Sequence, residues 1–185
     1  TAVVLGEMQA LCPTQIAVVE PGPNQGKGNA VRSGALAVLA DPAVQFVGYW
    51  DADLATPLEE ALRFYEAMTE NPAHELVCGC RLSRLGARIE RRGSRHYLGR
   101  IFATLASWML GVPAYDTQCG AKLMTRALAE SVFADPFVTR WCFDVEILAR
   151  IIKKHGRSGL CNMVMENPLQ AWTEKGGSKL GVRHS

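Results

Sequence analysis

Apolar runs of strand length alternate with helical segments along most of the chain. Strands are expected at residues 15–20, 45–50, 75–81 and 119–124, and helices at 2–11, 29–40, 56–68, 97–110 and 141–155. This alternation predicts an α/β fold with a mainly parallel sheet flanked by helices. No repeat or low-complexity linker divides the 185 residues, so we expect a single domain over 1–185.

Capping residues and the 3.6-residue period predict where helices begin and which faces they bury. Thr56 is expected to cap one helix, with Pro57 at its first position and Glu59 closing a capping box. The predicted apolar faces are Leu58, Ala61, Leu62, Tyr65 and Met68 in this helix, and Leu98, Phe102, Leu105 and Met109 in the helix at 97–110. Gly156 is expected to end the helix at 141–155.

Composition narrows the class of protein. Hydrophobic residues make up 48% and charged residues 21% of the chain, which excludes a disordered tail, a collagen repeat and a coiled coil. The six cysteines lack the paired spacing of zinc sites and lie within apolar stretches, so we expect buried thiols in the reducing cytoplasm. The longest strongly apolar stretch, residues 101–112, is shorter than the about 20 residues that a membrane-spanning helix needs.

Positive charge gathers in one segment, although the net charge of the chain is only +2. Residues 81–100 contain seven arginines and a single acid, Glu90. This arginine block suits either an anionic ligand or lipid surface, or a nucleic acid. Because few aromatic residues are interleaved with the arginines and the net charge is low, we expect no nucleic-acid partner.

Asp51 and Asp53 are separated by one small residue and directly follow an apolar strand. Two carboxylates so placed offer oxygen ligands to a hard divalent cation, Mg²⁺ or Mn²⁺, and leave positions open for phosphate oxygens. Ligands of open parallel sheets bind beyond the carboxyl ends of the strands, where this pair is expected. The structural alternative is that one aspartate caps the turn before Thr56 and the other is solvated.

A glycine-rich turn, Asn-Gln-Gly-Lys-Gly-Asn at residues 24–29, precedes the second expected helix. Gly26 and Gly28 let the backbone approach a ligand closely, and Lys27 adds a positive charge beside the free N–H groups of the helix start. These features predict phosphate binding. The turn is not a Walker A loop, because Gly28 stands where that motif needs Ser or Thr. An ordinary helix-initiating turn is the other interpretation.

Longer motifs follow one another along the chain: N-x-G-K-G-x-A-V-R-x-G (24–34), D-A-D-L-A-T-P-x-E (51–59), G-x-R-L (79–82), R-x-x-x-G-R (95–100), D-T-Q-C-G-x-K-L (116–123), R-W-x-F-D-V-E (140–146) and W-T-E-x-x-G-S-K-L (172–180). In order and spacing they resemble the family 2 glycosyltransferases that load sugars onto polyprenyl phosphates, especially the dolichyl-phosphate β-glucosyltransferase-like enzymes. The resemblance implies a GT-A type, Rossmann-like fold. Family members begin with further strands whose motifs do not occur here, so we expect this domain to lack its N-terminal strands.

The resemblance also implies a reaction: inverting transfer of a hexose, with glucose favoured, from a nucleoside diphosphate sugar such as UDP-glucose to a polyprenyl phosphate. Asp53, helped by Asp51, would hold Mg²⁺ or Mn²⁺, and Gln118 and Asp144 would orient sugar hydroxyls. Nucleotide and phosphate contacts are expected from Lys27, Gly26, Gly28, Asp51, Arg81, Arg95 and Arg100.

Other interpretations stay open. A family 2 transferase acting on a soluble or polysaccharide hydroxyl would need Asp144 as its general base. A catalytically silent scaffold is a further alternative, as is a nucleic-acid-binding module that uses the arginine block. The helix at 97–110 is either a core helix or one that lies at a membrane interface, near the lipid acceptor at the cytoplasmic face.

Overall fold

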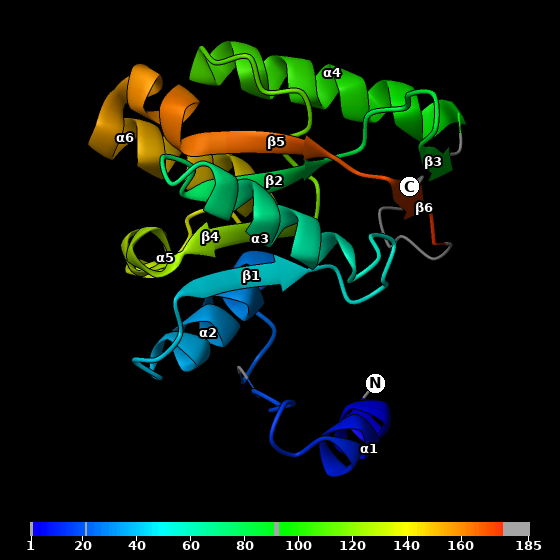
Figure 1. Cartoon of the computed structure of the whole chain (residues 1–185), viewed down its shortest axis with the longest axis vertical. Helices are drawn as coiled ribbons and strands as arrows, with labels where there is room; N and C mark the ends of the chain where they lie inside the picture. The colour runs from blue at the N-terminus through cyan, green and yellow to red at the C-terminus, as the bar shows by residue number, and fades with distance from the viewer. Residues whose placement is uncertain (1, 21, 91–92, 176–185) are drawn as a thin grey trace, which may run out of the picture.

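The structure, a computed structural model, describes residues 2–20, 22–90 and 93–175, without the side chains of residues 2 and 93–100. Its centre is a four-stranded sheet with the spatial order β1 (Phe46–Trp50), β4 (Ala121–Thr125), β2 (Leu76–Cys80) and β5 (Val164–Pro168) (Figure 1). β4 runs antiparallel to both of its neighbours, whereas β2 and β5 are parallel. The predicted α/β sheet is therefore confirmed. Three of its strands, β1, β2 and β5, run in one direction, and β4 runs in the opposite direction.

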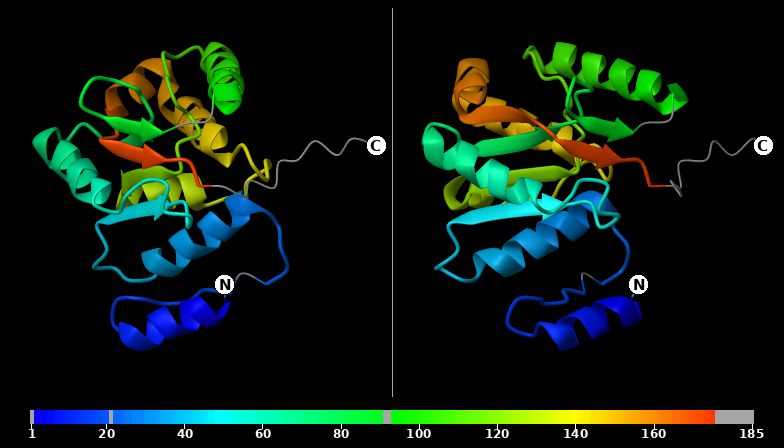
Figure 2. Two further views of the ribbon diagram at one scale, coloured as in Figure 1. Left: turned by 90° about the vertical axis from the view of Figure 1, so that its right-hand side faces the viewer. Right: turned by 45° about the vertical axis from the view of Figure 1, so that its right-hand side comes forward.

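Helices cover both faces of this sheet (Figures 1 and 2). They are α2 (Lys27–Leu39), α5 (Arg126–Phe133) and α6 (Phe143–Met163) on one face and α3 (Glu60–Glu70) on the other. Successive residues of β2 point to opposite faces: Cys78 joins the core beneath α6, and Val77 joins the core beneath α3. The sheet is thus buried on both sides, as its apolar strands predict.

The remaining elements lie at the margins of the sheet. α1 (Ala2–Leu11) stands apart beyond α2, and α4 (Gly93–Leu110) lies beyond the β5 edge (Figures 1 and 2). β3 (Arg88–Glu90) and β6 (Ala171–Thr173) form a small parallel sheet of their own. In the described part of the chain, no helix combines the length and apolarity needed to cross a membrane.

The strand predicted at residues 15–20 and the helix cap predicted at Thr56 are both wrong. Residues 15–20 form no strand and are mostly exposed, because no segment among the described residues pairs with them. Thr56 does not cap α3, which begins four residues later. The intervening backbone makes short-range bonds instead, from Glu60 N to Pro57 O (3.3 Å) and from Ala61 N to Leu58 O (2.9 Å), as in a 3₁₀ turn.

The buried face of α3 also differs from the predicted one. Phe64 and Met68 pack on the sheet, with the Phe64 ring centroid 5.5 Å from that of Trp50. Glu60 is buried as well, because its carboxylate accepts hydrogen bonds from Arg63 Nη1 (2.5 Å) and Gln170 N (2.7 Å). The predicted core residues that are instead exposed are Leu58, Leu62 and Tyr65. Polar pairing at Glu60 and ring packing at Phe64 therefore set the rotation of this helix.

α4 packs by its small residues rather than by the predicted apolar stripe. Ala103 and Ala106 are buried, whereas Leu105 and Met109 are 55% and 76% exposed. Phe102 is half-buried, and the side chain of Leu98 lies outside the described residues. Alanine allows a close approach between helices, so the bulky side chains are left on the outer face of α4.

Gly156 interrupts α6 but does not end it. Its φ of 74° and ψ of 174° break the regular helix, yet helical residues continue to Met163. The left-handed φ suits glycine, which pays no Cβ penalty there. Sequence reasoning therefore found the break and missed the short helical segment beyond it, together with α5 and β5.

Three cysteines are buried as predicted, and burial raises the pKa of Cys78 to about 12 and that of Cys119 to about 11. Cys80 is the third. The expectation is wrong for Cys12 and Cys161, which are exposed, and Cys142 is only half-buried. Cys12 follows α1, which stands apart from the sheet, and this accounts for its exposure.

We predict that Arg126→Met lowers the free energy of unfolding by about 2–3 kcal/mol, because three charge-assisted hydrogen bonds are lost and two partly buried carbonyls are left unpaired. The guanidinium donates to Leu39 O (2.7 Å), Asp41 O (2.7 Å) and Val44 O (3.1 Å), which fastens the end of α2 to α5. Chemical denaturation measures the change. Glu130→Gln, the control, removes only the exposed ion-pair partner of Arg126 and costs less than about 1 kcal/mol. Equal effects of the two substitutions would contradict this account.

Candidate active site

Asp51 follows β1 and lies directly over Gly120, the residue before β4. Its N–H donates to Gly120 O (2.8 Å), and its Oδ1 forms an ion pair with Lys27 Nζ at 2.5 Å. A Cβ at position 120 would lie 1.9 Å from Asp51 Oδ2. Glycine is therefore required at position 120 for the Asp51 carboxylate to occupy its place, a role that sequence reasoning missed.

Asp53 is exposed in the tight turn that follows β1. Its Oδ1 accepts from Ala55 N (2.9 Å), and Leu54, with a left-handed φ of 52°, donates its N–H to Asp51 O (3.1 Å). Among the described residues, no group of three or more His, Cys, Asp or Glu side chains is placed to hold a metal ion. The hard oxygen donors of Asp51 and Asp53 nevertheless fit Mg²⁺ or Mn²⁺ as two protein ligands.

The glycine-rich turn packs against the segment before α6. Gly28 N donates to Arg140 O (3.2 Å), and Gly26 N donates to Asn24 Oδ1 (3.0 Å). A Cβ at position 28 would lie 2.9 Å from the Phe143 side chain, and Gly26 has a left-handed φ of 97°. The glycines thus permit a close backbone contact within the protein, and this contact brings Lys27 to Asp51.

Glu146 holds the segment that supports this turn. Its carboxylate accepts from Val138 N (3.1 Å), Thr139 N (3.0 Å) and Arg150 Nη2 (2.8 Å). Partial burial alone raises the pKa of Glu146, but these hydrogen bonds outweigh that effect and lower the pKa below its ordinary value. The motif that contains Arg140 and Glu146 therefore acts as a brace for the glycine-rich turn.

Arg81 forms a two-pronged ion pair with Asp116 after β2. Arg81 Nε and Nη2 lie 2.7 Å from Oδ2 and Oδ1 of Asp116, and the guanidinium lies 5.4 Å from the Trp172 ring. Burial tends to lower the pKa of Arg81, but the hydrogen bonds and charge of Asp116 raise it above its ordinary value. Glu166, which the sequence did not single out, accepts from Tyr115 N (2.7 Å) and Asp116 N (2.6 Å) and fixes the loop.

Asp144 is only 2% exposed. Its Oδ1 accepts from Lys122 Nζ and from the Tyr49 hydroxyl, both at 2.6 Å. Gln118 is half-buried and lies in the loop whose Thr117 and Cys119 carbonyls accept hydrogen bonds from Lys122. Sequence reasoning identified Asp144 and Gln118 but missed Lys122, which binds both the Asp144 carboxylate and the loop that carries Gln118.

Most of the predicted site residues meet at one edge of the sheet. β1 and β2 end there and the reversed strand β4 begins there, so Lys27, Asp51, Arg81 and the loop at 116–120 come from different parts of the chain to the same edge. Arg95 and Arg100 lie in α4, but their side chains fall outside the described residues.

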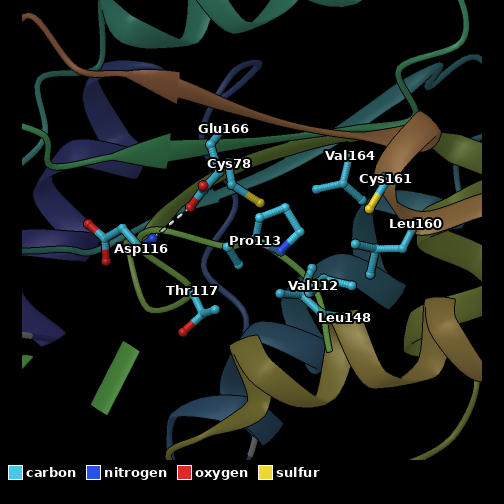
Figure 3. Close-up of a pocket in the computed structure, with 11 residues that line it drawn as sticks. Cys78, Val112, Pro113, Asp116, Thr117, Leu148, Leu160, Cys161, Val164 and Glu166 are labelled. Carbon is cyan, nitrogen blue, oxygen red and sulfur yellow. Dashed lines mark hydrogen bonds between the residues drawn. The ribbon is translucent and has the colours of Figure 1, made fainter. Parts of the chain in front are cut away.

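A separate apolar cavity of about 200 Å³ lies between α6 and the sheet. Figure 3 shows Asp116, Thr117 and Glu166 at one end of it and Leu160, Cys161 and Val164 at the other. Neither Asp51 nor Asp53 lines this cavity. The charged edge of the sheet, rather than the cavity, is therefore the candidate active site.

Dolichyl-phosphate beta-glucosyltransferases are similar to the chain over most of its length. One from Trichomonas vaginalis is 33% identical, and the match covers 91% of this chain and 48% of the relative. One from Drosophila melanogaster is also 33% identical, and the match covers 97% of this chain and 53% of the relative. The human relative is 32% identical, and the match covers 85% of this chain and 47% of the relative. The chain thus spans about half the length of the curated relatives it matches. No protein-family model matches the chain.

Solved structures share the fold. Glucosyl-3-phosphoglycerate synthase from Mycobacterium tuberculosis in complex with UDP has a TM-score of 0.63 at 16% identity, over 94% of this chain and 57% of the other. The same synthase in complex with Mn²⁺, UDP-glucose and phosphoglyceric acid has a TM-score of 0.54 at 18% identity. The match covers 90% of this chain and 51% of the synthase chain. The chain therefore has the GT-A fold of glycosyltransferases. Within that class, its sequence relates it to the dolichyl-phosphate β-glucosyltransferases, which confirms the resemblance found in its motifs.

We predict that Gly120→Ala lowers the free energy of unfolding by about 1–3 kcal/mol, the usual cost of overpacking, because the new methyl group collides with the Asp51 carboxylate. Chemical denaturation measures this change. Gly34→Ala is the matched control: it lies in α2 with nothing within 4 Å of its added Cβ, and it raises stability by up to about 1 kcal/mol. Adding Asp51→Ala to the Gly120 variant recovers most of the loss. If it does not, the collision with Asp51 is not the cause.

Proposed function

We propose that the protein transfers glucose from UDP-glucose to a polyprenyl phosphate, with inversion at the anomeric carbon and with Mg²⁺ or Mn²⁺. The observation that carries this proposal is the turn of Asp51 and Asp53, which lies beside Lys27 at the carboxyl edge of the sheet. The chain that contains this turn is related to dolichyl-phosphate beta-glucosyltransferases. The synthase that shares the fold has been solved with Mn²⁺ and UDP-glucose, which supports the same donor and ion here.

The donor diphosphate is proposed to lie between Lys27 and the two aspartates. Asp51 and Asp53 would hold the divalent ion, which would offset the charge that develops on the departing diphosphate. Lys27 is 32% exposed in its ion pair with Asp51, so the pair is worth at most about 1 kcal/mol and is readily exchanged. Lys27 thus leaves Asp51 for a phosphate oxygen when the donor binds.

The acceptor is proposed to react through its own phosphate. One phosphate oxygen attacks the anomeric carbon while the bond from that carbon to UDP breaks, and UDP leaves with the electron pair. The second pKa of a phosphate monoester is about 6, so the acceptor phosphate is already an anion at neutral pH and needs no strong general base. Arg81, Arg95 and Arg100 are proposed to grip the phosphates, and Gln118 to orient the sugar hydroxyls.

Donor binding tests this proposal. Calorimetry of the full-length protein with Mn²⁺ is expected to show tighter binding of UDP-glucose than of GDP-mannose or UDP-N-acetylglucosamine. Asp53→Asn is expected to weaken metal-dependent binding by at least about tenfold, which corresponds to 1.4 kcal/mol. The matched control is Asp135→Asn, an exposed aspartate that follows α5.

Turnover assays then separate the acceptors. A short polyprenyl phosphate is expected to accept glucose, whereas soluble sugars and polysaccharides are not. Transfer to a sugar hydroxyl would favour the alternative transferase. If no nucleotide sugar binds with metal, the protein is not a transferase of this kind.

The polyprenyl acceptor also suggests a membrane contact, and we propose that the outer face of α4 supplies it at the cytoplasmic surface. Four large apolar residues at helical spacing are more than half exposed on α4: Ile101, Leu105, Trp108 and Met109. Leu85 is fully exposed in the turn before β3, and Arg84 and Arg88 beside it are exposed. Apolar side chains next to basic ones suit the interface of a bilayer with anionic headgroups.

Vesicle binding tests this contact. The full-length protein is expected to bind vesicles that contain anionic lipid, and Leu85→Ser combined with Trp108→Ser is expected to weaken binding at least about tenfold, because apolar burial is lost. Leu62→Ser, which changes a 67% exposed leucine on α3, is the control. Equal binding by all three proteins would overturn the proposed contact.

A further inference from the structure

Lys122 is a charged residue in the middle of the protein core. It lies in β4 and its side chain has no solvent exposure. Its ammonium group lies 2.6 Å from Asp144 Oδ1, 2.8 Å from Cys119 O and 3.2 Å from Thr117 O. A lysine ammonium has three donors, so these three acceptors use all of them.

The ion pair holds this charge in place. Burial has the largest single effect and lowers the pKa of Lys122, but the charge and hydrogen bond of Asp144, together with Cys78 and Cys119, raise the pKa above its ordinary value. The ammonium therefore stays charged throughout the neutral range. Buried ion pairs contribute little net stability, since a well-packed apolar pair of similar volume is often as stable. Stability alone thus gives no good reason for a lysine here.

The position of the acceptors suggests a different role. Thr117 O belongs to the peptide group just before Gln118, and Cys119 O belongs to the peptide group between Cys119 and Gly120. Lys122 therefore holds the backbone on both sides of Gln118. The same loop contains Gly120, which lies beneath the Asp51 carboxylate. Asp144 lies in the first turn of α6, one residue after Phe143, which packs against Gly28. Lys122 therefore joins the Gln118 loop to the helix that supports the glycine-rich turn.

We propose that Lys122 is a positioning residue, which with Asp144 holds the Gln118 carboxamide at the place where it contacts the donor sugar. This inference rests on the proposed function. It also gives Asp144 a role other than that of a base, because Asp144 is buried and its Oδ1 already accepts two hydrogen bonds. Lys122 itself does not contact the sugar, and it acts only through the loop.

The test removes the charged pair without leaving one charge buried alone. Lys122→Met combined with Asp144→Asn, in the full-length protein, keeps side chains of similar size and leaves no unpaired ion. We expect kcat for glucose transfer to fall about 10- to 100-fold, the usual cost of a misplaced group. We expect the affinity for UDP with Mn²⁺ to change less than threefold, and the gain in affinity from UDP to UDP-glucose to shrink.

A matched control separates positioning from structural support. Tyr49→Phe removes the other hydrogen bond to Asp144 Oδ1 but leaves the carbonyls of Thr117 and Cys119 paired with Lys122. We expect this variant to lose stability yet to retain kcat within about threefold. Because Gln118 is the proposed target, Gln118→Ala is expected to lower kcat similarly and to add little to the double variant.

The outcomes distinguish the two proposals. If the unmodified protein neither binds UDP-glucose nor transfers glucose, the proposed function fails. If the unmodified protein is active and the double variant retains its kcat, or if Tyr49→Phe lowers kcat equally, the positioning role of Lys122 is overturned.

Discussion

The hydrogen bond from Asp51 N to Gly120 O is the contact on which the candidate site depends. β1 and β4 pair antiparallel with Trp50 opposite Ala121, and this bond continues the ladder one residue beyond the end of β1. Asp51 and Gly120 therefore face each other where the sheet ends. A shift of one residue in this register would put a side chain beneath the Asp51 carboxylate and displace it.

Successive side chains of β4 point to opposite faces of the sheet, so its first two residues, Ala121 and Lys122, have different environments. Ala121 joins the core beneath α3, whereas Lys122 points to the opposite face and meets Asp144 of α6. Gly120, Ala121 and Lys122 thus connect the turn of Asp51 and Asp53, one core layer and the loop of Gln118 within three residues. Because the three residues are consecutive at the start of β4, the site edge and the buried ion pair share one register.

Local sequence signals predicted the elements that carry the site. The strand expected at 45–50 is Phe46–Trp50, and the turn with Asp51 and Asp53 follows it. Contacts between distant segments could not be predicted in this way. Lys122 and Asp144 are 22 residues apart, and the need for glycine at position 120 appears only when β1 and β4 are paired. The buried face predicted for α4 was wrong because both sides of this helix carry apolar residues. Periodicity alone does not tell which side packs against the protein.

Three ion pairs at the site, Lys27–Asp51, Arg81–Asp116 and Lys122–Asp144, differ in burial. The side chains of Lys27 and Asp51 are 32% and 37% exposed, those of Arg81 and Asp116 are 24% and 9% exposed, and those of Lys122 and Asp144 are 0% and 3% exposed. Water screens the first pair, so an anionic ligand can compete for Lys27 at little cost. Separating the last pair would leave a bare charge in the core, which is costly. Competition by an anionic ligand therefore costs least at the open end of this series, while the closed end fixes the backbone on both sides of Gln118.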